Sequence, residues 1–406
     1  MSTSDEKMHY LEKNILWNPW WVLSKNTCTA LDAQEFSISM NRPAPPLRDQ
    51  PPTPPPPAKP PEPKRAPKSL IEGFLDFKDW LNTPPPPKSP KPTTAVASSK
   101  PRVKPFDLQD IPDALDRIGW PMSAKLQRKW FSGELNYATT DEGAAIGINQ
   151  NGKPFPSSMV DTTMFKLDWI LGFDRARKKY DELLNRDYLF SRAAVRVLKK
   201  KFIGKDSSAN HVDPRDLCGA DIQRWHKEYQ FQLITVDSGN LKKFEMFLRG
   251  VAWKDGTFMD DLYGALGAFS INAALGEHQY VVDKTEWRGR LIVNEIVVYM
   301  RDVFTFHDRS QEMGTQYLGH WNKRGFIVVP IATVVGELTE LDFPNYPVAL
   351  YNAISDATVY YPVRNKGYRI WQMKTKQGGD IVLYSDRRSV RLNPPKIIEF
   401  DFSGAI

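Results

Sequence analysis

One stretch of the sequence gathers the residue types used in acid–base chemistry, MRDVFTFHDRSQEMGTQYLGHWNKRGF at 300–326. A strand ending near Asp302 leads to His307 and Asp308, and a loop then returns to His320 and Asn322. If these side chains converge at one end of a sheet, a histidine beside a carboxylate could transfer protons. The alternative, to which we give more weight, is structural: the polar groups satisfy loop backbone while neighbouring aromatic rings close the end of the sheet.

A second polar group, YSDRR at 384–388, follows the turn at Gly378-Gly379 and places Asp386 beside two arginines. Ion pairing at a strand end is the favoured explanation for it. The sequence has no GxxxxGK[ST], GxSxG or HExxH pattern, and its six histidines form no pair at metal-ligand spacing. These residues therefore stay candidates without an assigned reaction, and we expect neither a metal nor a cofactor.

The formal charge of +7 lies in one segment of the chain. Residues 41–105 hold twelve basic and five acidic side chains, and the remainder balances at 43 of each. A neutral remainder is poor support for a DNA-binding face, so the composition disfavours nucleic acid as a partner.

The two cysteines, Cys28 and Cys218, are far apart and fit a reducing cytosol. The first residues, MSTSDEKMHYLEK, do not form a signal peptide. The longest uncharged run, 262–276, is too short to span a bilayer. We expect a cytoplasmic protein without a membrane span, and a specialised secretion machine would deliver it without such a signal.

Residues 1–40 form a short aromatic N-terminal segment whose main feature is WNPWW at 17–21. Trp17 is separated from Trp20 and Trp21 by an Asn-Pro turn. The rings either tuck onto the main domain or anchor a protein partner.

Residues 41–105 form a basic linker that contains 21 of the 33 prolines. Proline fixes φ and removes a backbone donor, so tracts such as PPTPPPP favour extended polyproline II. The N-terminal segment is thus expected to be tethered to the body.

An apolar island at 69–82 interrupts this linker and predicts an amphipathic helix. Ser69 and Glu72 form a capping box at its start, and Asn82-Thr83 before Pro84 end it. The helix either packs on its own body or enters a groove of another protein. The residues that would make this contact are Leu70, Phe74, Phe77, Trp80 and Leu81.

The body begins near Phe106, and residues 106–265 are expected to be mainly helical. Residues 107–130 predict two short helices broken at Trp120-Pro121, and 133–158 are loop-like. Apolar residues at three- and four-residue steps predict a long helix over 160–184, capped by Asp161 or Thr162. Further helices are expected at 187–202, 214–228 and 241–249.

Residues 266–406 are expected to be β-rich, because short alternating runs are separated by turn residues. The fold class predicted is α+β, a helical first part followed by a mostly antiparallel sandwich or barrel-like domain. The first strand is expected from about Ala268, where Phe269, Ile271, Ala273 and Leu275 alternate with small or polar residues. The strands expected after it are at 278–284, 290–300, 302–307, 325–334, 346–352, 357–363, 380–385, 389–393 and 396–402.

Five long blocks of the body occur in a recognisable order: RIGWPMSAKLQRKWFSG (117–133), VDTTMFKLDWILGFDRARKKYDEL (160–183), DDLYGALGAFSINAAL (260–275), RDVFTFHDRSQEMGTQYLGHWN (301–322) and GGDIVLYSDRRSVRLNPP (378–395). Over about 110–395 the chain resembles the bacterial domain-of-unknown-function family numbered 6402. No established activity comes with this resemblance. It implies a context, since genes of the family are often found near type VI secretion spike, adaptor and toxin genes.

Where the family reads Asp-Ser-Tyr-Asp-Phe, this chain has Asp302-Val303-Phe304-Thr305-Phe306. The second acid is replaced by Thr305. If that acid acts in relatives, the same chemistry would be impaired here, so the departure counts against a chemical role for this segment.

Three functions remain open at this point. The first is a type VI secretion-associated cargo or effector of interbacterial competition, with N-terminal docking elements and a body of unknown activity. The second is a non-enzymatic adaptor or chaperone of a secretion cluster that binds protein partners through the 69–82 helix. The third, a binder of nucleic acid or acidic ligands through the linker, has the least support. The partner expected is a secretion carrier, an adaptor or an immunity protein.

Overall fold

The computed structural model describes residues 28–30, 40–43, 103, 106–203, 208–237, 260–286, 288–308, 315–327, 347–350 and 353–401. Residues 1–45 and 103–406 belong to one compact unit, and residues 46–102 belong to a second. The predicted helices at 69–82 and 241–249 and the three tryptophans of WNPWW lie outside the described residues.

The first helices of the body confirm the predicted break at Trp120-Pro121. The short helix η1 (Leu108–Asp110) runs into α2 (Ile111–Arg117), and α3 (Pro121–Ser132) follows. Asp261, on α12 (Asp261–Leu266), accepts hydrogen bonds from the first backbone N–H groups of α3, Met122 N at 2.9 Å and Ser123 N at 2.8 Å. Because those donors have no partner within the helix, Asp261 fixes where α3 begins. The expected loop after α3 contains one short helix, α4 (Asp141–Ile146).

The single helix expected over 160–184 is wrong in its first turns. Residues Val160–Phe165 form strand β2, and helices α5 (Leu167–Leu171) and α6 (Asp174–Leu184) follow. Strand β2 pairs in parallel with β12, Val160 opposite Val382, so a tertiary contact overrides the helical pattern. Asp161 caps no helix; its carboxylate accepts from Thr163 N and Met164 N, both at 2.8 Å.

The remaining helices of the first part lie close to the predicted ranges. The region expected at 187–202 divides at Ser191, whose hydroxyl accepts from Ala194 N at the start of the second helix. Strands also occur in this part, which the pattern did not predict. The elements are α7 (Arg186–Leu189), α8 (Arg192–Phe202), β3 (Ala209–Val212), α9 (Pro214–Cys218), α10 (Ile222–Tyr229) and β4 (Gln230–Val236).

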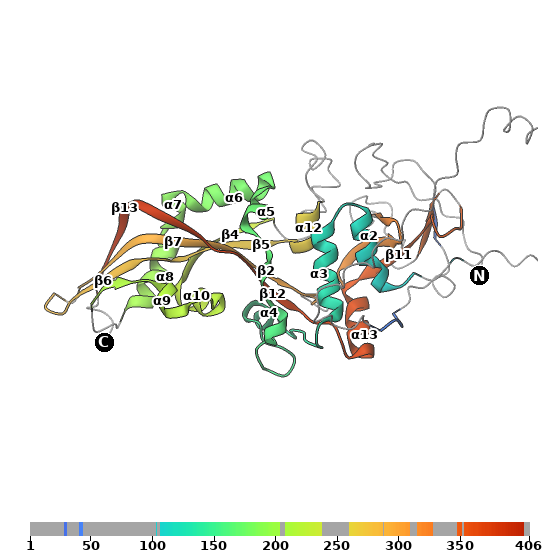
Figure 1. The fold of residues 1–406 in the computed structure, drawn as a ribbon, viewed down its shortest axis with the longest axis horizontal. Helices are drawn as coiled ribbons and strands as arrows, with labels where there is room; N and C mark the ends of the chain where they lie inside the picture. The colour runs from blue at the N-terminus through green and yellow to red at the C-terminus, as the bar shows by residue number, and fades with distance from the viewer. Residues whose placement is uncertain are drawn as a thin grey trace, which may run out of the picture. The chain divides into compact units, whose positions relative to one another are not determined.

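A 17-residue strand, β7 (Arg288–Phe304), is the centre of an eight-stranded sheet (Figure 1). On one side it pairs with β6 (His278–Asp283) and then β5 (Phe269–Leu275). On the other side it pairs with β13 (Arg388–Asp401) and then β12 (Ile381–Ser385). All four pairings are antiparallel, and the strands expected separately at 290–300 and 302–307 are one element.

A β-bulge changes which residues of β7 face the core. Asn294 N and Glu295 N both donate to Glu277 O, at 3.0 and 3.1 Å, so two residues of β7 oppose one residue between β5 and β6. Buried residues before the bulge are Leu291 and Val293, and after it Ile296, Val298 and Met300, a shift of one residue in the alternation.

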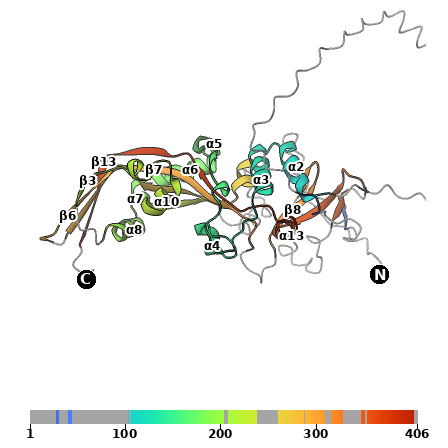
Figure 2. The same cartoon turned by 60° about the horizontal axis from the view of Figure 1, so that its bottom comes forward.

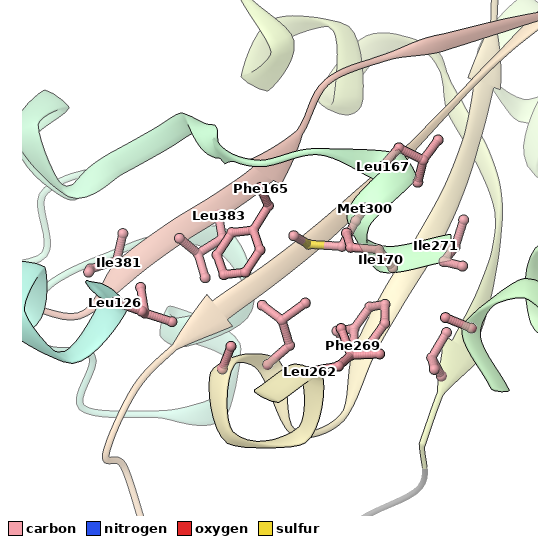
Figure 3. Packing of buried hydrophobic residues seen from close by; sticks show 14 of the residues in the cluster. Leu126, Phe165, Leu167, Ile170, Leu262, Phe269, Ile271, Met300, Ile381 and Leu383 are labelled. Atoms are coloured by element: carbon pink, nitrogen blue, oxygen red, sulfur yellow. The ribbon is translucent and has the colours of Figure 1, made fainter. Parts of the chain in front are cut away.

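Two hydrophobic cores cover the two faces of this sheet. The larger packs the sheet against α3, α5, α6, α8 and α12, and Figure 3 shows Phe165, Met300 and Leu383 meeting within it. The smaller core lies on the opposite face beneath α4, α9 and α10 and contains Trp225 and Tyr299. Successive residues of β7 therefore point into different cores.

A second sheet has five strands in the order β1-β10-β11-β8-β9. Helix α13 (Asn365–Thr375), which the sequence pattern did not predict, follows β11 and lies beside this sheet (Figure 2). The N-terminal strand β1 pairs with β10, Cys28 opposite Leu350, so the N-terminal segment contributes to the fold of the body. The strands are β1 (Cys28–Ala30), β8 (Tyr317–Asn322), β9 (Gly325–Ile327), β10 (Val348–Leu350) and β11 (Val359–Arg364).

The predicted α+β class, helices first and mostly antiparallel strands second, is confirmed. Within the described ranges, no helix has the length and apolar character needed to cross a bilayer.

Candidate functional site

Three of the polar residues predicted to converge, Asp302, His307 and Asp308, lie at the end of β7 and in the segment that follows it. Aromatic packing fixes this end: the Phe306 ring stacks on Tyr368 of α13 with centroids 3.6 Å apart, and Trp130 of α3 meets Phe306 edge-on at 4.9 Å. Burial of each such ring contributes about 1.5–3 kcal/mol. The polar side chains before and after Phe306 are therefore held by a rigid apolar anchor.

Asp302 lies in β7 opposite Leu383 of β12. By strand alternation it shares a face with Met300, which belongs to the larger core. Burial raises the pKa of Asp302 to about 7, while the Val303 N–H and the Arg301 charge act to lower it. A half-buried carboxyl group with this pKa can both donate and accept a proton near neutral pH.

His307 and Asp308 follow directly but have different partners. His307 Nε2 lies 3.5 Å from Asp141 Oδ1 at the start of α4. Asp308 Oδ1 accepts from Gln316 N and from Asn365 Nδ2, both at 2.9 Å. A histidine beside a carboxylate is thus present, although the carboxylate is Asp141 and not one of the predicted acids.

The three other candidates have structural contacts. His320 is fully buried in β8, and its Nδ1 lies 2.5 Å from the Tyr317 hydroxyl. Asn322 Oδ1 accepts from Arg324 N at 2.8 Å in the turn between β8 and β9. Asp386 Oδ1 accepts from Leu167 N at 2.6 Å at the start of α5. Of the predicted set, His307 and Asp308 meet at one amide, since Asn365 Nδ2 also donates to His307 O at 3.3 Å.

Sequence reasoning missed a buried ion pair next to this position. Asp380 immediately precedes β12, and the pairing of Ile381 with Phe304 brings it beside Thr305. The Arg369 guanidinium of α13 binds Asp380 with two parallel hydrogen bonds, Nη1 to Oδ1 at 3.1 Å and Nη2 to Oδ2 at 2.9 Å. The Asp380 side chain is fully buried and that of Arg369 is 19% exposed.

Three other groups also donate hydrogen bonds to the Asp380 carboxylate. Thr305 Oγ1 donates to Oδ2 at 2.7 Å, Ala138 N donates to Oδ2 at 3.2 Å, and Trp130 Nε1 donates to Oδ1 at 3.4 Å. Both oxygens are therefore occupied, and the pair joins α3, α13, β7 and β12. Such a carboxylate holds structure together and has little capacity left for a substrate.

Titratable groups also gather on the opposite face of the sheet, and no sequence pattern connects them. His226 Nδ1 lies 2.8 Å from the Tyr299 hydroxyl, and Arg301 Nε donates to the Tyr384 hydroxyl at 3.3 Å. Burial, together with the positive charges of Arg301 and Lys201, lowers the pKa of His226 to about 4, so the ring is neutral at neutral pH. Burial raises the pKa of Tyr299 well above its usual value.

In the ranges that the structure describes, no three His, Cys, Asp or Glu side chains are grouped so that they could hold a metal ion. Two described residues have a capacity for proton transfer, the half-buried Asp302 of β7 and His307 beside Asp141.

Comparison with known proteins gave one match. The model of a family of unknown function, DUF6402, matches residues 106–400. No curated protein and no solved structure gave a significant match.

Proposed function

We propose, from the premise that this chain belongs to DUF6402, a family of unknown function, that it is a type VI secretion-associated cargo or effector of interbacterial competition. One observation carries the proposal: the family match begins at residue 106, so the aromatic segment and the proline-rich linker lie outside the shared module. An N-terminal segment and a linker joined to a family module form a layout that suits a delivered protein. The gene context implied by the family resemblance supports the same role.

In this proposal the body acts after delivery, and Asp302 is its first candidate for proton transfer. Its raised pKa, half-buried position and place on the core face of β7 distinguish it from the acids that pair with arginine or cap a helix. His307 with Asp141 is the second candidate, because the pair lies on the segment that follows. The reaction and the substrate stay open.

Expression of the full chain in a sensitive bacterium tests the effector role. The chain is produced without an export signal, so that it stays in the cytoplasm, or with an added one, so that it reaches the periplasm. We expect growth to stop in only one of these two compartments. An Asp302→Asn variant should restore growth, because the amide cannot transfer the proton. Asp386→Asn, which keeps an acceptor for Leu167 N, should stay toxic. Normal growth of the bacterium with the chain in either compartment would rule out a toxic activity.

A second function, a non-enzymatic adaptor, is favoured by one observation. Two of the predicted candidates, Asn322 and Asp386, have structural contacts, and so does the neighbouring Asp380. In this role the predicted 69–82 helix, together with Trp17, Trp20 and Trp21, would bind a secretion carrier, adaptor or immunity protein.

A Phe74→Asp/Trp80→Asp double variant is expected to lose capture of a neighbouring secretion protein in a pull-down, because charge on the apolar face of a docking helix prevents its burial. The melting temperature of the variant should equal that of the wild type. A matched control, Lys78→Asp/Lys88→Asp, changes two charged residues of the same segment and should retain the partner. A large fall in melting temperature would show instead that the helix packs on its own body.

A further inference from the structure

We propose that the body carries a recognition site for an extended Asn-Arg-Pro peptide at the corner formed by η1 and α13, and that residues Asn41–Pro43 are its occupant within the chain. We call this the latch site. It is formed by Asp107, Gln109, Asp110, Trp371 and Lys374. The inference is independent of the proposed role in secretion.

The latch site recognises the peptide backbone through two side-chain donors. Trp371 Nε1 donates to Arg42 O at 3.0 Å, and Gln109 Nε2 donates to Arg42 O at 2.6 Å and to Pro43 O at 2.8 Å. Trp371 is fully buried in the aromatic cluster around Trp130. Departure of the peptide would remove the acceptor of a buried indole N–H, which is costly.

The Arg42 side chain is bound by two carboxylates. Its Nη1 lies 3.2 Å from Asp110 Oδ1 and its Nε lies 3.7 Å from Asp107 Oδ1. These acids are pre-oriented by the capping box of η1, in which Asp107 Oδ1 accepts from Gln109 N at 2.9 Å and Asp110 Oδ2 accepts from Asp107 N at 3.0 Å. Two like charges held this close favour a cation between them.

The neighbouring residues define the shape of the peptide. A residue before proline prefers extended backbone, so Pro43 favours the conformation in which Arg42 presents its carbonyl. Lys374 donates to the Asn41 side chain, and Met40 packs at the edge of the larger core. The site therefore fits an extended segment with arginine before proline.

Occupation of this site holds residues 40–43 on the body without help from the segment that follows them. Met40 and Val103, which lie before and after the proline-rich segment in the sequence, both pack against the larger core. Asp107, only four residues after Val103, binds Arg42. Residues 40–43 are thus held on the body by contacts that do not depend on the covalent linker.

Cleavage of the full chain tests this proposal. A protease site inserted after Pro57 and then cut should give two fragments that co-elute in gel filtration. Arg42→Ala and Asp110→Asn should each release the N-terminal fragment about two- to fivefold faster, since each removes a partly exposed ion pair. Arg48→Ala is the matched control, a nearby arginine outside the described residues, and should release it at the wild-type rate.

A competitor and a strand variant separate the latch site from the pairing of β1 with β10. The peptide MNRPAP (residues 40–45) in excess should accelerate release, whereas MNAPAP should not. Thr29→Pro, which disrupts β1, should add to the effect of Arg42→Ala. The proposal is overturned if the wild-type fragments separate at once, or if only Thr29→Pro changes the rate.

Discussion

An Asp380→Ala variant is expected to lose about 3–5 kcal/mol of unfolding free energy, because it leaves the Arg369 guanidinium buried without its counter-ion. The loss includes the acceptor for Thr305 Oγ1, Ala138 N and Trp130 Nε1. Chemical denaturation followed by tryptophan fluorescence measures it, since Trp130 lies in the same network. Asp386→Ala, which loses only the contact with Leu167 N at a helix start, is expected to cost about 1 kcal/mol.

A double-mutant cycle isolates the ion pair itself. Arg369→Ala combined with Asp380→Ala should be less destabilising than the sum of the two single variants, with a coupling energy near the top of the range of about 0.5–3 kcal/mol. Strictly additive effects would contradict a direct interaction, and would assign the loss to packing around Trp130 instead.

An Asp302→Asn variant is expected to be more stable than the wild type above neutral pH and about equally stable near pH 4. The ordinary pKa of an aspartate is 3.8, and burial raises that of Asp302 to about 7 in the folded protein. Below pH 3.8 the Asp302 carboxyl group is protonated in both the folded and the unfolded protein. Between the two values the unfolded state has released its proton and the folded state has not, so raising the pH favours unfolding.

Above pH 7 the carboxylate is ionised in both states, and the full cost of burying its charge remains. A difference of about three pH units corresponds to about 4 kcal/mol, and we expect a gain of about 2–4 kcal/mol at pH 8 because Asp302 is only half-buried. Melting temperatures of both proteins from pH 4 to 8 measure the effect, with Asp386→Asn as the control. Parallel curves for wild type and Asp302→Asn would contradict the assignment.

The elements that the sequence predicted well are those specified by local signals. Pro121 divides the first two helices, and the alternation of apolar residues in β7 identifies a strand without any knowledge of its partners. Strand β2 was not predicted because Phe165, at its end, lies at helical spacing from Trp169 and Phe173. Residues 160–165 form a strand because they pair with β12, which lies far later in the sequence. Helix α13 was missed because Asn365-Lys366-Gly367 has the composition of a turn.

The candidate residues predicted from the sequence lie in different surroundings in the structure. Asp302 and His307 stand in a recognisable run, yet the acid beside His307 is Asp141, far away in the sequence. No local sequence motif identifies the Asp380–Arg369 pair, because the groups that bind Asp380 come from separate parts of the chain. The glycines before Asp380 were the one available signal, because a buried acid at a strand start after such a turn needs a partner.

The central position of β7 has a consequence for how the chain acquires its structure during synthesis. Its partners β5 and β6 precede it closely in the sequence, whereas β12 and β13 lie in residues 381–401. Strand β2 also cannot pair until β12 has been synthesised. Pairing across such sequence distances is slow. Until residues 381–401 have left the ribosome, β7 has an open edge that can pair with another strand. Protection of that edge by a chaperone during translation would therefore matter more for this protein than for one with local strand pairing.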